Sequence, residues 1–298
     1  MIQLKTASGK TIPSIGLGTY PFQGRVMTDM VKSAVRVGYR LFDTSDDYYG
    51  EKGIGVAIKE LEKEHICGRE DLFIQTKISS NAAYMDEPLI GVYFNKQSPF
   101  MQRHTVEELV REKVSTSLRD LGTDYIDSLL IHLPYPDYIE EIWDCMTMLK
   151  DEGIVRYIGV SNFHKRHIES IARNGIYPSF NEIYISPIGI KKEDVSYNQS
   201  HDILIMTYSP LMDLSHNMIP LDTIQPLMNK YNKSAAQIIL RWNIDRGCLP
   251  LPKTRNKSRL EENFNIFDFS LTKEEIDVVS SVNRDYQYLV ESKICPGL

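Results

Sequence analysis

Several side chains that can transfer protons end apolar, strand-like runs of this sequence. Lys77 ends the run Leu-Phe-Ile-Gln-Thr-Lys, His132 ends Ser-Leu-Leu-Ile-His, and Asp43 ends a third run, with Tyr48 just beyond it. A surface or packing role would explain any one of these residues alone. Together they offer a proton donor, a cation that lowers its pKa, a carboxylate that holds the cation, and a neutral donor that orients an oxygen.

A basic cluster near the end of the sequence is a second chemical feature. Lys253-Thr-Arg-Asn-Lys-Ser-Arg259 contains four cations, although the whole chain has a formal net charge of −6. That net charge argues against a nucleic-acid or acidic-membrane partner for the molecule as a whole. The plain alternative for the cluster is a solvated helix start. Because cations at a helix N-terminus oppose the helix dipole, we favour a bound anion.

Strands and helices are predicted to alternate along the chain and so to position these residues. A hairpin is predicted at Ile2–Lys5 and Thr11–Pro13, with its turn at Ser8-Gly9-Lys10. Eight further strands are predicted at Ser14–Tyr20, Tyr39–Thr44, Leu72–Ile78, Tyr125–His132, Tyr157–Val160, Phe180–Ile185, Ile203–Tyr208 and Cys248–Lys253. The helices are predicted at Thr28–Val37, Gly53–Glu64, Thr105–Leu121, Tyr138–Asp151, Lys165–Arg173, Lys191–Val195, Asp222–Tyr231, Ser234–Asp245, Ser258–Phe264 and Thr272–Val282.

This alternation predicts an α/β fold, a (β/α)8 TIM barrel of eight parallel strands. We expect one domain over residues 1–298, with an N-terminal β-hairpin cap and a C-terminal helix and loop. A doubly wound fold would need a glycine fingerprint after the first strand. Gly16-Leu-Gly18 lacks the third glycine, and Gly53-Ile-Gly55 does not directly follow a strand. Both pairs are predicted to be tight packing positions.

In such a barrel the chemistry lies at the carboxyl ends of the strands. Polar residues stand at or near these ends from the second strand to the eighth: Asp43-Thr44, Thr76-Lys77, His132, Ser161-Asn162, Asn181-Glu182, Tyr208-Ser209 and Lys253-Thr254.

These residues belong to motifs that resemble the aldo-keto reductase family over essentially the whole chain, in order and at the family's spacing. The motifs are Gly16-Leu-Gly-Thr19, Asp43-Thr44 with Tyr48 and Glu51, Thr76-Lys77, Ile131-His132-Leu-Pro134, Gly159-Val-Ser-Asn-Phe163, Tyr208-Ser-Pro-Leu211, and Pro252-Lys-Thr254 through Arg259 and Asn263.

The resemblance implies reduction of an aldehyde or ketone to an alcohol, with the hydride coming from NADPH. Tyr48 would be the general acid, and its ordinary pKa near 10 would be lowered by the Lys77 ammonium. Asp43 would keep Lys77 charged and oriented. His132 would hydrogen-bond the carbonyl oxygen.

The resemblance also implies an NADPH/NADP⁺ site. Tyr208 would stack on the nicotinamide, Ser161 and Asn162 would contact its carboxamide, and Ser209 and Leu211 would lie on the pyrophosphate side. Lys253, Thr254 and Arg259 would bind the 2′-phosphate. The remaining expected cofactor residues are Gly18, Thr19, Tyr20, Asp43, His132, Glu182, Pro210, Arg255, Glu262 and Asn263.

The sequence departs from the family at several positions near the expected substrate. The family commonly has Trp near Tyr20 and at the position of Leu133, and it has Gln where this chain has Glu182. The segment Ser79–His104 is longer than the family norm, and Arg284–Leu298 falls in the family's variable C-terminal loop. We expect Tyr20, Tyr48, His132 and Leu133 to line the substrate pocket, but the substrate itself cannot be carried over from the family.

Two other functions remain open at this point. One is a barrel lyase in which Lys77 forms a Schiff base. The other is a non-catalytic, NADPH-binding regulatory module.

The chain has four widely separated cysteines and no CxxC pair, which predicts no metal site and a cytoplasmic setting. We expect no signal peptide and no membrane-spanning run, and we take a monomer as the default with an oligomer left open.

Overall fold

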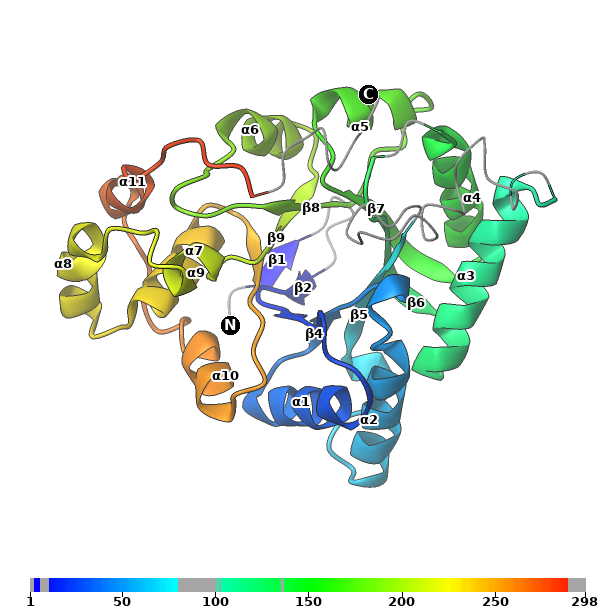
Figure 1. The fold of residues 1–298 in the computed structure, drawn as a ribbon, viewed down its shortest axis with the longest axis horizontal. Helices are drawn as coiled ribbons and strands as arrows, with labels where there is room; N and C mark the ends of the chain where they lie inside the picture. Colours follow the sequence, from blue (N-terminus) through cyan, green and yellow to red (C-terminus); the bar gives the residue numbers. More distant parts are fainter. Residues whose placement is uncertain (1–2, 6–10, 80–100, 102, 135–136, 289–298) are drawn as a thin grey trace.

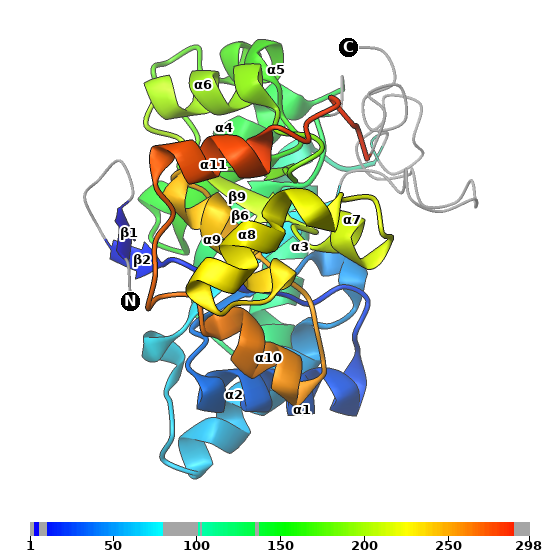
Figure 2. The same cartoon turned by 90° about the vertical axis from the view of Figure 1, so that its left-hand side faces the viewer.

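The computed structural model describes residues 3–5, 11–79, 101, 103–134 and 137–288 (Figure 1). Its first element is a hairpin of β1 (Gln3–Lys5) and β2 (Thr11–Pro13), in which Leu4 pairs with Ile12 in antiparallel register. The hairpin lies at the end of the barrel opposite α7 (Met212–Ser215), which follows a barrel strand (Figure 2). The predicted cap is therefore confirmed at the amino end of the strands.

Eight parallel strands form the barrel, each hydrogen-bonded to the next in chain order. Backbone bonds from Gly16 N to Pro250 O and from Gly18 N to Pro252 O, both 3.1 Å, join the first strand to the last. The predicted (β/α)8 fold is confirmed. The strands are β3 (Leu17–Gly18), β4 (Leu41–Asp43), β5 (Phe73–Ile78), β6 (Ile126–Ile131), β7 (Val155–Ser161), β8 (Phe180–Tyr184), β9 (Leu204–Tyr208) and β10 (Leu249–Leu251).

Helices surround the strands on the outside (Figure 1). The helix over Val106–Leu121 begins with the predicted capping box: Thr105 Oγ1 accepts from Glu108 N at 3.2 Å, and Glu108 Oε2 accepts from Thr105 N at 2.8 Å. The helices besides α7 are α1 (Gly24–Val37), α2 (Glu51–Lys63), α3 (Val106–Leu121), α4 (Ile139–Asp151), α5 (Lys165–Ile171), α6 (Lys192–Ser200), α8 (Leu221–Tyr231), α9 (Ala235–Asp245), α10 (Lys257–Phe264) and α11 (Lys273–Ser280), with 3-10 turns η1 (Asp46–Tyr48) and η2 (Arg69–Asp71).

Some predicted boundaries were wrong. The first barrel strand covers only Leu17–Gly18 of the predicted Ser14–Tyr20, and α1 begins at Gly24 rather than Thr28. Helix α6 continues to Ser200, well past the predicted Val195, and α7 was not predicted. Since α6 is polar along most of its length, its sequence carries little helical periodicity.

The glycine pairs are packing positions, as predicted. A Cβ added at Gly16 would lie 2.3 Å from the side chain of Leu41, and one at Gly55 would lie 2.4 Å from the carbonyl oxygen of Asp120. Either contact would force the neighbouring elements apart.

Several sequence predictions fall outside the described residues: the turn at residues 8–10, nearly all of the segment 79–104, and the end of the chain from 289, which includes Cys295. Within the described part, no helix is long and apolar enough to cross a membrane. No cluster of potential metal ligands occurs in that part either.

Candidate active site

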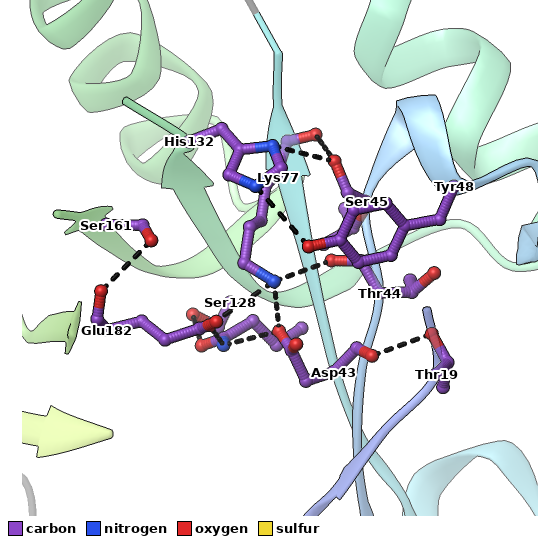
Figure 3. Close-up of polar contacts among 12 residues, drawn as sticks. Thr19, Asp43, Thr44, Ser45, Tyr48, Lys77, Ser128, His132, Ser161 and Glu182 are labelled. Carbon is purple, nitrogen blue, oxygen red and sulfur yellow. Dashed lines mark hydrogen bonds and ion pairs between the residues drawn. The ribbon is translucent and has the colours of Figure 1, made fainter. Parts of the chain in front are cut away.

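The four residues predicted to do the chemistry meet at one end of the barrel (Figure 3). Asp43 ends β4, Lys77 lies in β5 next to it, Tyr48 ends η1, and His132 directly follows β6. Their convergence follows from the barrel, because parallel strands bring their carboxyl ends to one rim.

Lys77 is the buried cation of the site. Its ammonium lies 2.6 Å from Asp43 Oδ1, 3.1 Å from the carbonyl oxygen of Thr44 and 3.3 Å from Glu182 Oε2. Burial opposes its charge, but Asp43 and Glu182 outweigh burial and raise the pKa of Lys77. Lys77 therefore stays protonated, which suits an electrostatic role and does not suit the Schiff-base chemistry of a lyase, since that needs a free amine.

Tyr48 and His132 face each other above this cation (Figure 3). Tyr48 Oη lies 3.4 Å from His132 Nε2, and Lys77 Nζ lies 5.2 Å from the centre of the Tyr48 ring. Burial is the main reason that the pKa of His132 is lowered to about 4. The nearby Lys77 charge also lowers this pKa, whereas the Asp47 carboxylate raises it. The imidazole is therefore neutral near pH 7 and has one N–H to donate.

Glu182 is fully enclosed and forms part of the same network. Gln75 Nε2 donates to Glu182 Oε2 at 2.7 Å and to Asp43 Oδ1 at 2.9 Å, while Gln75 Oε1 accepts from Ser128 Oγ at 3.0 Å. Burial and the Asp43 charge raise the pKa of Glu182 well above its ordinary value, although the Lys77 charge lowers it. Two carboxylates thus share one lysine at the floor of the site.

Three of the residues expected at the nicotinamide form one connected group. Ser161 Oγ donates to the carbonyl oxygen of Glu182 at 3.0 Å, and Asn162 Nδ2 donates to Ser161 Oγ at 3.0 Å. Tyr208 donates through its hydroxyl to Asn162 Oδ1 at 2.9 Å. Tyr208 and Asn162 also line a groove of about 870 Å³, so the Tyr208 ring borders open space.

The residues expected on the pyrophosphate side follow β9 directly. Ser209 has a positive φ of 51°, and Leu211 is the residue before α7. The chain therefore turns sharply at Ser209-Pro210-Leu211 on leaving the barrel, at the same end as Tyr48 and Lys77.

The basic cluster lies at the start of α10, as predicted. Asn256 Oδ1 caps this helix by accepting from Ser258 N at 3.0 Å and Arg259 N at 3.3 Å. Thr254 is buried, but the four cations Lys253, Arg255, Lys257 and Arg259 are exposed, and none forms an ion pair with any described residue.

Some other exposed cations do have carboxylate partners: Arg25 pairs with Asp29, and Arg36 pairs with Glu64. The basic cluster therefore has the composition and the unsatisfied charge of an anion site.

Glu262 and Asn263 complete the expected cofactor residues on α10. Glu262 Oε1 accepts from Ser234 Oγ at 2.5 Å, and Ser234 is the N-cap of α9. Asn263 is buried. The contacts of Glu262 within the described chain thus fix α10 against α9.

Residues at the end of β3 and just after it line the other side of the site. Thr19 Oγ1 donates to the carbonyl oxygen of Asp43 at 2.8 Å, beside Gly18 at the barrel seam. The exposed Tyr20 ring lies 5.0 Å from the Tyr48 ring. Leu133 is only 1% exposed, so the two predicted pocket-wall residues differ sharply in exposure.

Sequence reasoning missed the roles of four polar residues: Ser45, Gln75, Ser79 and Ser128. All four are buried. Ser45, Gln75 and Ser79 contact Asp43, Glu182 or His132, and Ser128 donates to Gln75. The available signal was a polar residue inside an apolar strand run, as with Gln75 in Phe-Ile-Gln-Thr-Lys.

Comparison with known proteins agrees with this geometry. The sequence model of the Aldo/keto reductase family matches residues 14–284. Methylglyoxal reductase DkgA of Yersinia pestis is 32% identical over 283 residues, covering 94% of this chain and 92% of that protein. Glyoxal reductase of Bacillus subtilis is 32% identical over 284 residues, covering 95% and 93%.

Solved structures have the same fold. The aldo-keto reductase AKR2E4 of Bombyx mori, determined in complex with NADP, superposes with a TM-score of 0.81 at 32% identity, covering 98% of this chain and 95% of that one. Aldose reductase of Schistosoma japonicum gives a TM-score of 0.84 at 28% identity, covering 99% and 96%.

Proposed function

The chain belongs to the aldo/keto reductase family and reduces carbonyl groups with NADPH, and we propose that Tyr48 is the general acid of this reaction. The observation that carries the proposal is the placement of the Tyr48 hydroxyl 3.4 Å from His132 Nε2, with the Lys77 ammonium below the ring. A substrate oxygen that reaches both groups can receive a proton from one and a hydrogen bond from the other.

Each charged or polar residue then has a defined task. When bound, NADPH supplies the hydride that reduces the carbonyl carbon. Tyr48 Oη gives its proton to the substrate oxygen, and the Lys77 ammonium stabilises the negative charge left on the tyrosine oxygen. His132, being neutral, donates from Nε2 and orients the substrate oxygen. Asp43 holds Lys77 in place at 2.6 Å.

The described residues fit NADPH in their chemistry. The exposed cations Lys253, Arg255 and Arg259 have no carboxylate partner in the described structure, and they would hold the 2′-phosphate together with Thr254. Ser161 and Asn162 would hold the carboxamide, and the Tyr208 ring would lie against the nicotinamide. The remaining predicted cofactor contacts, from Gly18 to Asn263, stay proposals.

For the substrate we propose small, polar aldehydes and 2-oxoaldehydes. The related proteins are named methylglyoxal reductase and glyoxal reductase, and methylglyoxal and glyoxal are compact, polar dicarbonyl compounds.

The test is a carbonyl panel with purified protein, followed by the loss of reduced-nicotinamide absorbance. Methylglyoxal and glyoxal should give a kcat/KM at least about tenfold above that of a long-chain apolar aldehyde. Equal values across the panel would contradict the substrate proposal, whereas turnover of no carbonyl at all would contradict the proposed role of Tyr48.

We further propose a single domain, a monomer and a cytoplasmic location. Cys67, Cys145 and Cys248 form no disulfide within the described part of the chain, which suits a reducing compartment. Size-exclusion chromatography with light scattering tests the monomer, and a single unfolding transition tests the single domain.

A further inference from the structure

The Nδ1 side of His132 is surrounded by groups that have no part in the proposed function. Ser79 Oγ lies 2.7 Å from Nδ1, Ser45 Oγ lies 3.3 Å from it, and Asp47 Oδ1 lies 3.7 Å from it. Figure 3 shows contacts from both ring nitrogens of His132, and only one of them reaches the Tyr48 hydroxyl. The ring therefore has a catalytic nitrogen, Nε2, and a nitrogen that is held by the protein.

The position of Ser79 is fixed by its own backbone. Ser79 directly follows β5, is buried, and donates from its N–H to Asp46 Oδ1 at 3.1 Å. The other oxygen of Asp46 forms an ion pair with Lys113 of α3 at 2.5 Å. Because Asp46 of η1 holds the main chain of Ser79 and is itself held by Lys113 of α3, the Ser79 hydroxyl has a defined reach to His132.

A neutral imidazole carries only one proton, on Nδ1 or on Nε2. His132 can donate to a substrate oxygen from Nε2 only when Nδ1 is an acceptor. A serine hydroxyl can fill that need by donating to Nδ1. An ionised Asp47 can only accept, so it favours the opposite tautomer, with the proton on Nδ1.

The distances decide between these neighbours. The Ser79 contact of 2.7 Å is a short hydrogen bond, whereas the Asp47 separation of 3.7 Å is too long for one. Asp47 Oδ1 is also buried without a hydrogen-bond partner in the described structure. Ser45 lies 3.3 Å from Ser79 Oγ and can donate to it, which leaves the Ser79 proton for His132.

We propose that Ser79 is a positioning residue that sets the tautomer of His132, by donating to Nδ1 so that Nε2 keeps its proton. This inference rests on the proposed role of His132 and deepens it. Without the Ser79 hydroxyl, the Asp47 carboxylate draws the proton to Nδ1, and Nε2 becomes an acceptor that repels a carbonyl oxygen. The other charged groups that act on the ring are Asp43 of β4, Lys77 of β5 and Lys113 of α3.

The first test reads the tautomer directly, without turnover. Protein with ¹⁵N-labelled histidine is examined by NMR near pH 7, and the His132 signals are assigned by their loss in His132→Gln. We expect a protonated Nε2 and an unprotonated Nδ1 in the wild type, and the reverse in Ser79→Ala. A wild-type Nδ1 that carries the proton, or an unchanged tautomer in Ser79→Ala, would overturn the proposal.

Kinetics then show whether the tautomer matters. Ser79→Ala should lower kcat about 10- to 100-fold with NADPH affinity unchanged, because one donor to the reacting oxygen is lost. Ser79→Thr keeps the hydroxyl and should stay within about threefold of wild type. Adding Asp47→Asn to Ser79→Ala should recover about tenfold, since the competing carboxylate is removed. A loss of activity that the second substitution does not relieve would show a merely structural role.

The controls separate this idea from the proposed function. Ser170→Ala removes a half-buried hydroxyl on α5 that donates to the carbonyl oxygen of His167, and it should leave both tautomer and kcat unchanged. Thermal unfolding checks that each variant folds, and Ser79→Cys, a weaker donor of similar size, carries the same test if Ser79→Ala does not. If no variant or wild type reduces carbonyls, the NMR result still stands, and the proposed function alone fails.

Discussion

Replacing Glu182 by glutamine should change which redox form of the cofactor the protein prefers. Glu182 is buried, lies 3.3 Å from Lys77 Nζ and shares Gln75 Nε2 with Asp43. When Glu182 is ionised, Asp43, Glu182 and Lys77 together carry one net negative charge. In Glu182→Gln, Asp43 and Lys77 remain and their charges cancel. The oxidised nicotinamide is cationic and the reduced one is neutral, so the negative charge should favour NADP⁺ over NADPH.

The size of the effect follows from competing terms. A unit charge about 5 Å from a cation, at an effective dielectric near 20, contributes about 3 kcal/mol. Lys77 at 3.3 Å cancels much of this charge, and desolvation removes more, which leaves about 1 kcal/mol, or about fivefold in affinity. Because burial and Asp43 raise the pKa of Glu182 well above its ordinary value, the carboxylate forms only as the pH rises. The effect should therefore grow with pH.

The assay is fluorescence titration of NADP⁺ and NADPH across about pH 5.5–8.5, which lies above the ordinary pKa of a glutamate. Glu182→Gln should weaken NADP⁺ relative to NADPH, more at the high end than at the low end. Glu112→Gln, which removes an exposed charge on α3, is the matched control. A dissociation-constant ratio that is the same in wild type and Glu182→Gln at every pH would refute the reasoning.

Three further predictions test other parts of the molecule. Arg259→Ala should weaken NADPH binding at least about tenfold and leave NADH nearly unchanged, since one charge-assisted phosphate contact contributes roughly 1.5–3 kcal/mol; equal losses for both cofactors would reject the phosphate assignment. Replacing residues 80–103 with a short Gly-Ser link should raise KM for the true substrate while cofactor affinity persists, because that segment begins three residues after Lys77 in the chain; an unmoved KM and substrate ranking would show that the segment does not shape the pocket. Burial raises the pKa of Glu51 to about 7. The stabilisation of the folded state by protonated Glu51 is therefore fully present below the ordinary pKa near 4.5 and is lost as the pH rises through about 7. Glu51→Gln should therefore unfold at higher urea than wild type at pH 8, by up to about 3 kcal/mol, with little difference at pH 4; a difference independent of pH would contradict this.

The order of elements could be predicted because strand and helix patterns alternate so regularly. The seven strands from β4 to β10 each overlap a predicted run, and the polar residue at each strand end could be read directly. Helix α7 could not be predicted, since four residues after a Ser-Pro-Leu turn carry no period. The first barrel strand was overestimated because residues 14–17 are buried at the barrel seam, although only Leu17 and Gly18 pair with β4.

The convergence of the candidate catalytic residues could be predicted from the sequence, and their supporting contacts could not. Asp43, Lys77 and His132 stand out in sequence because each ends an apolar run. The network below them depends on strand register, in which Asp43 of β4 is paired with Gln75 of β5 and Gln75 is paired with Ser128 of β6. A one-residue change in that register would turn Gln75 to the other face, so its link between Asp43 and Glu182 exists only in three dimensions.

Replacement of Tyr48 by phenylalanine tests the general-acid assignment most directly. The change removes one hydroxyl and keeps the ring contacts with Tyr20 and His132, so the fold and the cofactor site should persist. Single-turnover reduction of methylglyoxal and NADPH titration should both be measured on wild type and Tyr48→Phe. We predict a fall in kcat of about 10²- to 10⁴-fold with NADPH affinity within about twofold of wild type. Retention of more than about a tenth of the wild-type kcat would mean that another group protonates the substrate oxygen.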